Sequence, residues 1–103
     1  MMEELLRALS DLPGPTGEED AVVAWLEREW EGRGEVTRTP VGNLLLRIPG
    51  PGPRVVIAAH MDELSMIVRS VTPEGFLRVI PGERDQFSTP YFFGAPLRVL
   101  ADS

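Results

Sequence analysis

Apolar residues recur at helical spacing in the first third of the chain and give way to short extended runs after residue 34. Leucines at positions 5, 6, 9 and 12 place one apolar stripe along a helix over residues 3–12, and the run Pro13-Gly14-Pro15 ends it. A second helix is expected to begin at a capping box over residues 16–19, in which Thr16 and Glu19 satisfy free backbone amides. It continues to Gly32.

The remaining chain reads as short strands separated by turns. A Pro-Gly connector occupies residues 49–53, a tight turn residues 72–75 and a polar loop residues 81–90. The expected strands cover residues 36–38, 44–48, 54–60, 65–71, 76–80 and 97–100. The run Arg54–His60 is the most apolar, which predicts a central strand buried on both faces. The pattern therefore predicts an α/β fold with two N-terminal helices and about six strands.

Composition narrows the function classes. The chain has 103 residues, 43% hydrophobic and 25% charged, which suits one small globular domain. Its net charge is −6 without a basic stripe, so neither nucleic acid nor an anionic membrane surface is an expected partner. It has no cysteine, which excludes disulfides, thiolate metal sites and a cysteine nucleophile. The acidic N-terminus and the lack of a long apolar run predict a cytoplasmic chain.

The pattern His60-Met61-Asp62 is the strongest candidate for chemistry. It follows the predicted central strand, at the end of a sheet where ligands usually bind. Residues two apart in extended backbone point the same way, so Asp62 can fix the imidazole tautomer of a metal-binding His60. The alternative is a hydrogen-bonded structural histidine, which these residues alone favour.

Other polar and aromatic groups have simpler explanations. Glu63 is expected to face away from the pair, as a solvated or helix-capping acid. The acids at positions 18–20 suit the first turn of the second helix. Ser65 and Ser70 have only His60 as a possible base, which argues against a serine nucleophile. The aromatic cluster 91–93 favours core or interface packing over base stacking.

Taken together, the ordered motifs resemble a known family. They are Leu12–Asp20, Gly42–Leu44, Ala58–Glu63 and Gly75–Leu77, of which Ala58–Glu63 is the most specific. In this order and spacing they resemble the amino-terminal part of the tetrahedral aminopeptidases, dinuclear metallopeptidases related to glutamyl and deblocking aminopeptidases and sometimes described as endoglucanases. The resemblance implies that residues 1–96 are the first part of a zinc-peptidase-like α/β catalytic domain, and that residues 97–103 begin an inserted dimerisation domain.

The resemblance also implies roles for the candidate pair. His60 would ligate one of two divalent ions, zinc or cobalt, and Asp62 would serve catalysis by orienting the imidazole. Residues 12–17 would be structural and cap the second helix. Water held between the metals would attack the first peptide bond of a peptide substrate. The family's other ligands and its general base lie beyond the position of Ser103. Ser65 and residues 81–85 depart from the family pattern, which leaves the substrate-side loops open.

Two interpretations follow. In the first, the chain is the N-terminal segment of a metal-dependent aminopeptidase, inactive alone, with no metal or a weakly bound one, and it self-associates or joins a missing C-terminal portion. In the second, it is a complete non-catalytic module that keeps the peptidase scaffold for assembly or regulation, with the aromatic cluster and an open sheet edge as its interface.

Overall fold

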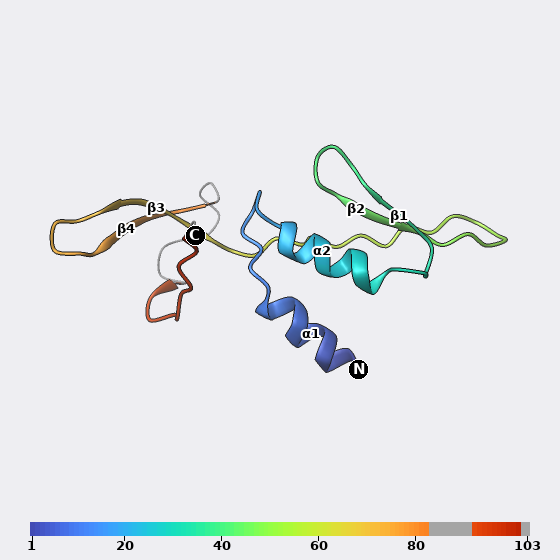
Figure 1. Cartoon of the computed structure of the whole chain (residues 1–103), viewed down its shortest axis with the longest axis horizontal. Helices are drawn as coiled ribbons and strands as arrows, with labels where there is room; N and C mark the ends of the chain where they lie inside the picture. The colour runs from blue at the N-terminus through green and yellow to red at the C-terminus, as the bar shows by residue number, and fades with distance from the viewer. Residues whose placement is uncertain (83–91, 102–103) are drawn as a thin grey trace. The chain divides into compact units, whose positions relative to one another are not determined.

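The computed structural model describes residues 1–82 and 92–101 (Figure 1). Within these residues the chain forms two helices and four strands, and the strands make two separate two-stranded antiparallel sheets. The chain divides into two units, Met1–Glu63 and Leu64–Ser103. A mixed α/β composition is therefore confirmed, whereas the expectation of about six strands is not.

The first unit contains both helices and one hairpin. Helix α1 spans Met2–Asp11 and helix α2 spans Asp20–Glu29. Strands β1 (Glu35–Arg38) and β2 (Leu44–Arg47) pair antiparallel, with Glu35 opposite Arg47. These four elements confirm the predicted helices and the first two predicted strands.

Helix α2 is attached to the hairpin through Arg38 of β1. The Arg38 guanidinium lies 3.3 Å from Asp20 Oδ1 and 3.5 Å from Glu27 Oε1, so one strand residue contacts acids near both ends of the helix. On the helix itself, Val22 and Val23 are the buried hydrophobic residues of the described part of the chain, at 5% and 3% exposure. The first unit therefore has a very small core, centred on α2.

The predicted capping box at the start of α2 is wrong. The helix begins at Asp20, Glu19 is its N-cap residue, and no side chain makes a capping hydrogen bond. Gly17 has a φ of +89°, a left-handed conformation that interrupts the helix before residue 18. Of the three predicted first-turn acids, Asp20 alone lies in the first turn. The Glu19 carboxylate instead accepts from the Gly17 amide at 2.9 Å.

The second unit contains a hairpin of strands β3 (Met66–Val71) and β4 (Leu77–Pro81). Its register shifts between Val68 and Ser70. The turn between the strands closes where the Gly75 amide donates to the Thr72 carbonyl at 2.9 Å, with Gly75 at a φ of +90°. This hairpin and its turn confirm the sequence prediction, while most of the predicted loop 81–90 lies outside the described residues.

Two predicted strands are wrong. Residues 54–60 and 97–100 take part in no strand, and the apolar side chains of both runs are exposed. Val55, Val56 and Ile57 are 80%, 86% and 94% exposed. A strand needs a hydrogen-bonding neighbour, and a central strand also needs apolar layers on both faces. The described residues supply neither to the run 54–60, so it stays extended without forming a sheet (Figure 1).

The aromatic cluster was expected to pack in a core or at an interface. Phe93 is 95% exposed, so core packing is wrong for this residue and interface packing stays a prediction. Tyr91 lies outside the described residues. In the part of the chain that the structure covers, no helix has both the length and the apolar character needed to cross a membrane.

Candidate functional site

A loop between the two helices holds the segment Met61–Glu63. The Glu63 amide donates to the Gly14 carbonyl at 2.8 Å, and the Gly14 amide donates to Glu63 Oε1 at 3.1 Å. Pro15 and Glu63 form an isolated parallel bridge. Gly14 is buried, and a Cβ at this position would lie 3.0 Å from Val22 Cγ2. The absence of a side chain at Gly14 therefore lets the loop approach both α2 and the segment that follows His60.

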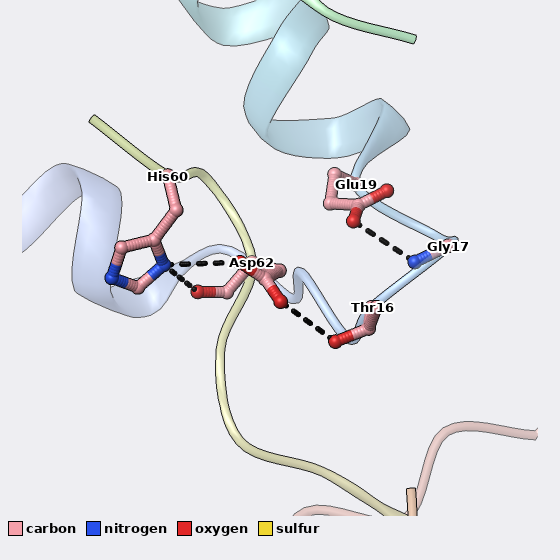
Figure 2. Close-up of polar contacts among 5 residues, drawn as sticks. All are labelled: Thr16, Gly17, Glu19, His60 and Asp62. Atoms are coloured by element: carbon pink, nitrogen blue, oxygen red, sulfur yellow. Dashed lines mark hydrogen bonds and ion pairs between the residues drawn. The ribbon is translucent and has the colours of Figure 1, made fainter. Parts of the chain in front are cut away.

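Thr16, Asp62 and His60 form a continuous chain of hydrogen bonds (Figure 2). The Thr16 hydroxyl donates to Asp62 Oδ2 at 2.7 Å, and Asp62 Oδ1 lies 3.0 Å from His60 Nδ1. The same ring nitrogen lies 3.0 Å from the Asp62 backbone carbonyl. The sequence predicted that His60 and Asp62 project together, and the structure does bring them into contact.

The charge on Asp62 determines what the ring can do. The Thr16 hydroxyl, followed by the hydrogen bond with His60, holds the pKa of Asp62 below its ordinary value. The carboxylate is therefore ionised at neutral pH and acts only as an acceptor. Because its two neighbours at Nδ1 are both acceptors, the neutral ring carries its proton on Nδ1 and a lone pair on Nε2. The His60 side chain is 86% exposed.

His60 and Asp62 also line a pocket of about 180 Å³. It brings together the N-cap of α2, the turn between β1 and β2, and the segment that contains the pair. The lining residues are Glu19, Val41, Gly42, Asn43, Ala59, His60, Met61 and Asp62. The pocket is therefore lined by one histidine and two acidic residues, all from the first unit.

The donor set fits one metal ligand with its carboxylate partner. An imidazole whose Nδ1 donates to a carboxylate is the usual arrangement of a metal-binding histidine. Across residues 1–82 and 92–101, however, no three side chains of His, Cys, Asp or Glu are placed to hold a metal ion together. A catalytic zinc needs three protein ligands, and the described residues by themselves do not supply such a set.

The other polar residues considered in the sequence make hydrogen bonds that hold the backbone. Glu63 is exposed, in agreement with the predicted solvated acid, and its carboxylate accepts from the Gly14 amide rather than capping a helix. Ser65 lies in the second unit, where its carbonyl accepts from the Gly82 amide at 3.0 Å. Sequence reasoning missed the contact of Thr16 with Asp62, because it joins residues 46 positions apart and no local pattern marks it.

Comparisons with known proteins bear on this site. A sequence profile of the M42 glutamyl aminopeptidase family matches residues 42–82, which include the Asn43 turn and the His60–Asp62 pair. The lysyl aminopeptidase of Pyrococcus furiosus is 34% identical over 83 residues, covering 76% of this chain and 23% of that protein. A putative aminopeptidase of Acetivibrio thermocellus is 33% identical over 78 residues, covering 75% of this chain and 24% of that protein.

A third relative carries a different activity in its name. A putative LysW-lysine/LysW-ornithine hydrolase of Pyrococcus furiosus is 37% identical over 60 residues, which cover 57% of this chain and 18% of that protein. No solved structure matches the chain significantly. The chain spans about a quarter of the length of the first two relatives. It is related to the amino-terminal portion of the M42 aminopeptidases, which confirms the resemblance seen in its motifs.

Proposed function

We propose that this chain is the N-terminal segment of a metal-dependent aminopeptidase that removes N-terminal residues from peptides, in the cytoplasm. His60 supplies one metal ligand through Nε2, and Asp62 orients the ring. The observation that carries the proposal is the contact of His60 Nδ1 with the Asp62 carboxylate at 3.0 Å, an arrangement typical of a histidine that binds metal through Nε2. When bound, zinc or cobalt ions would polarise the scissile carbonyl and activate water.

The residues of this chain have a limited part in that reaction. His60 binds and places one side of the metal centre, while Asp62 keeps the proton on Nδ1. The described residues bring no third metal-binding side chain to the pair, and one imidazole holds zinc poorly. We therefore propose that the 103 residues alone do not hydrolyse peptides. The other ligands would come from a further polypeptide portion or from self-association.

The exposed run 54–60 supports the same proposal. Residues 55–59 within it are all apolar, and no ladder of the described residues uses either backbone edge of the run. Strands on both sides and apolar layers on both faces are what an α/β domain supplies to a central strand. If two copies of this chain paired antiparallel through this run, one backbone edge of each run would be hydrogen-bonded and the other edge would stay unpaired.

A chimaera tests the proposal. The region of the Pyrococcus furiosus lysyl aminopeptidase that matches this chain is replaced by the corresponding residues of this chain. We expect metal-dependent release of amino acids from aminoacyl para-nitroanilides, its loss in His60→Gln, and a 10- to 100-fold lower rate in Asp62→Asn. Glu31→Gln, an exposed acid outside the site, is the matched control and should leave the rate unchanged.

Two outcomes would contradict the proposal. One is a chimaera that assembles like the parent enzyme, binds peptide and stays inactive. The other is metal-dependent hydrolysis by the purified 103-residue chain. Solution mass adds a check on the non-catalytic module, because that alternative predicts a stable, defined oligomer of the chain alone.

A further inference from the structure

Thr16 has a contact that its place in the sequence does not explain. It lies in the loop between α1 and α2, four residues before the helix begins, and the N-cap position of that helix is taken by Glu19. Its hydroxyl instead donates to Asp62 Oδ2 at 2.7 Å, a short hydrogen bond to an ionised acceptor. The bond joins the loop to the side chain that contacts His60.

The two oxygens of Asp62 have different partners. Oδ2 accepts from Thr16 and Oδ1 pairs with His60 Nδ1, so rotation of the carboxylate breaks at least one of these bonds (Figure 2). Asp62 is 28% exposed and His60 is 86% exposed, so packing restrains the carboxylate more than the ring. The backbone carbonyl of Asp62 also lies 3.0 Å from Nδ1, so both Asp62 contacts act on the same ring nitrogen.

We propose that Thr16 is a positioning residue: it locks the rotamer of the Asp62 carboxylate and thereby fixes the tautomer and ring orientation of His60. The loop carries this hydroxyl to a fixed place because Gly14 and Glu63 clamp it through two hydrogen bonds to the same segment. The purpose of the arrangement rests on the proposed function, in which the ring that Asp62 orients is a metal ligand. The positioning itself is a property of this chain alone.

The single histidine makes the positioning measurable. At about pH 8, where a histidine ring is neutral, the ¹⁵N shifts of its two nitrogens report the ratio of the Nδ1–H to the Nε2–H tautomer. We expect the wild-type 103-residue chain and Thr16→Ser to favour Nδ1–H. In Thr16→Val this ratio should fall by about threefold, because the carboxylate loses one of its two restraints while the backbone acceptor remains.

A control and a second probe separate positioning from general loss of structure. Thr39→Val removes a hydroxyl of the same unit that accepts from the Asn43 amide at 3.0 Å, and it should leave the tautomer ratio unchanged. The Glu63 amide reports the clamp, because it donates to the Gly14 carbonyl. Its hydrogen exchange should be the same in the wild type and in Thr16→Val.

Each outcome decides the proposal. A lower ratio in Thr16→Val with unchanged Glu63 exchange supports positioning. An unchanged ratio overturns it, and so does a changed ratio accompanied by faster Glu63 exchange, which would show that Thr16 only stabilises the loop. These results do not depend on catalysis, so an inactive chimaera would contradict the proposed function and leave the positioning role standing.

Discussion

Two adjacent stretches of this chain differ sharply in how they are held. Residues 54–59 are strongly apolar, yet they are exposed and join no sheet in the described structure. Residues 61–63 are partly polar, yet the loop between α1 and α2 fixes them through backbone and carboxylate hydrogen bonds. His60 lies at the junction. The described residues therefore hold His60 Nδ1 against Asp62, whereas none of them pairs with the extended run that precedes it.

The largest expected difference between the two stretches is in amide exchange. The Glu63 amide has a carbonyl partner at 2.8 Å, whereas Val56 and Ile57 belong to no strand. We expect Glu63 to exchange on the order of 100-fold more slowly than Val56 and Ile57, after correction for intrinsic rates. Equal protection of the two stretches would show that residues 54–59 find a strand partner in solution, so that both stretches are held by hydrogen bonds.

A pair of side-chain truncations tests the same difference between a buried and an exposed apolar residue. Val23 is 3% exposed and Ile57 is 94% exposed. Val23→Ala removes buried methyl groups and should cost about 2 kcal/mol, seen as about 30-fold faster exchange of α2 amides. Ile57→Ala should change the same rates by less than about twofold, because surface substitutions have small effects. A large effect of Ile57→Ala would place this side chain in a core.

Two glycine substitutions probe the clamp itself. In Gly14→Ala the new Cβ lies 3.0 Å from Val22 Cγ2 and 3.4 Å from the Met61 carbonyl, so the loop or the segment must shift. We expect a cost of about 1 kcal/mol and about fivefold faster exchange at Glu63. Gly50→Ala is the matched control, because nothing lies within 4 Å of its Cβ position. Unchanged exchange at Glu63 in Gly14→Ala would mean that the two hydrogen bonds between Gly14 and Glu63 do not hold the loop tightly.

The difference between local and long-range contacts explains which features the sequence predicts. Local patterns were enough for both helices, the two hairpins and the turn at Gly75, because their hydrogen bonds join residues close in sequence. The pairing of His60 with Asp62 followed from the two-residue period of extended backbone. The run 54–60 was predicted from its apolarity alone, and apolarity indicates a strand without showing which partner covers it.

The start of α2 and the clamp were beyond local reasoning for a different reason. The capping box assigned Thr16 to its nearest helix, whereas its hydroxyl bonds to Asp62, 46 positions away. Likewise, Glu63 was assigned to solvent or to a helix end, although its carboxylate accepts from Gly14, 49 positions away. Both are long-range contacts of polar side chains, which leave no periodic signal in the sequence.

The smallest expected effect concerns the charge of Asp62 and tests the restrained side of the comparison directly. Hydrogen bonds from Thr16 and then His60 hold the pKa of Asp62 below its ordinary value, so folding favours the ionised form. A group with a depressed pKa contributes stability that is present above its unfolded pKa, about 3.9, and is lost as the pH falls through the lower folded value. The contacts of Asp62 should therefore persist from neutral pH to about pH 4 and disappear only in stronger acid. The ¹³C shift of the Asp62 carboxyl, followed against pH, gives the titration midpoint of this group. The midpoint should rise in Thr16→Val and stay low in Thr16→Ser.

Glu74 in the second hairpin serves as the control. Its pKa is lowered by its own backbone amide and by the Thr72 hydroxyl, so Thr16→Val should leave the pKa of Glu74 unchanged and Thr72→Val should raise it. A midpoint for Asp62 at or above the ordinary aspartate value would show that the loop does not hold this carboxylate, and residues 61–63 would then be no better fixed than the run before them.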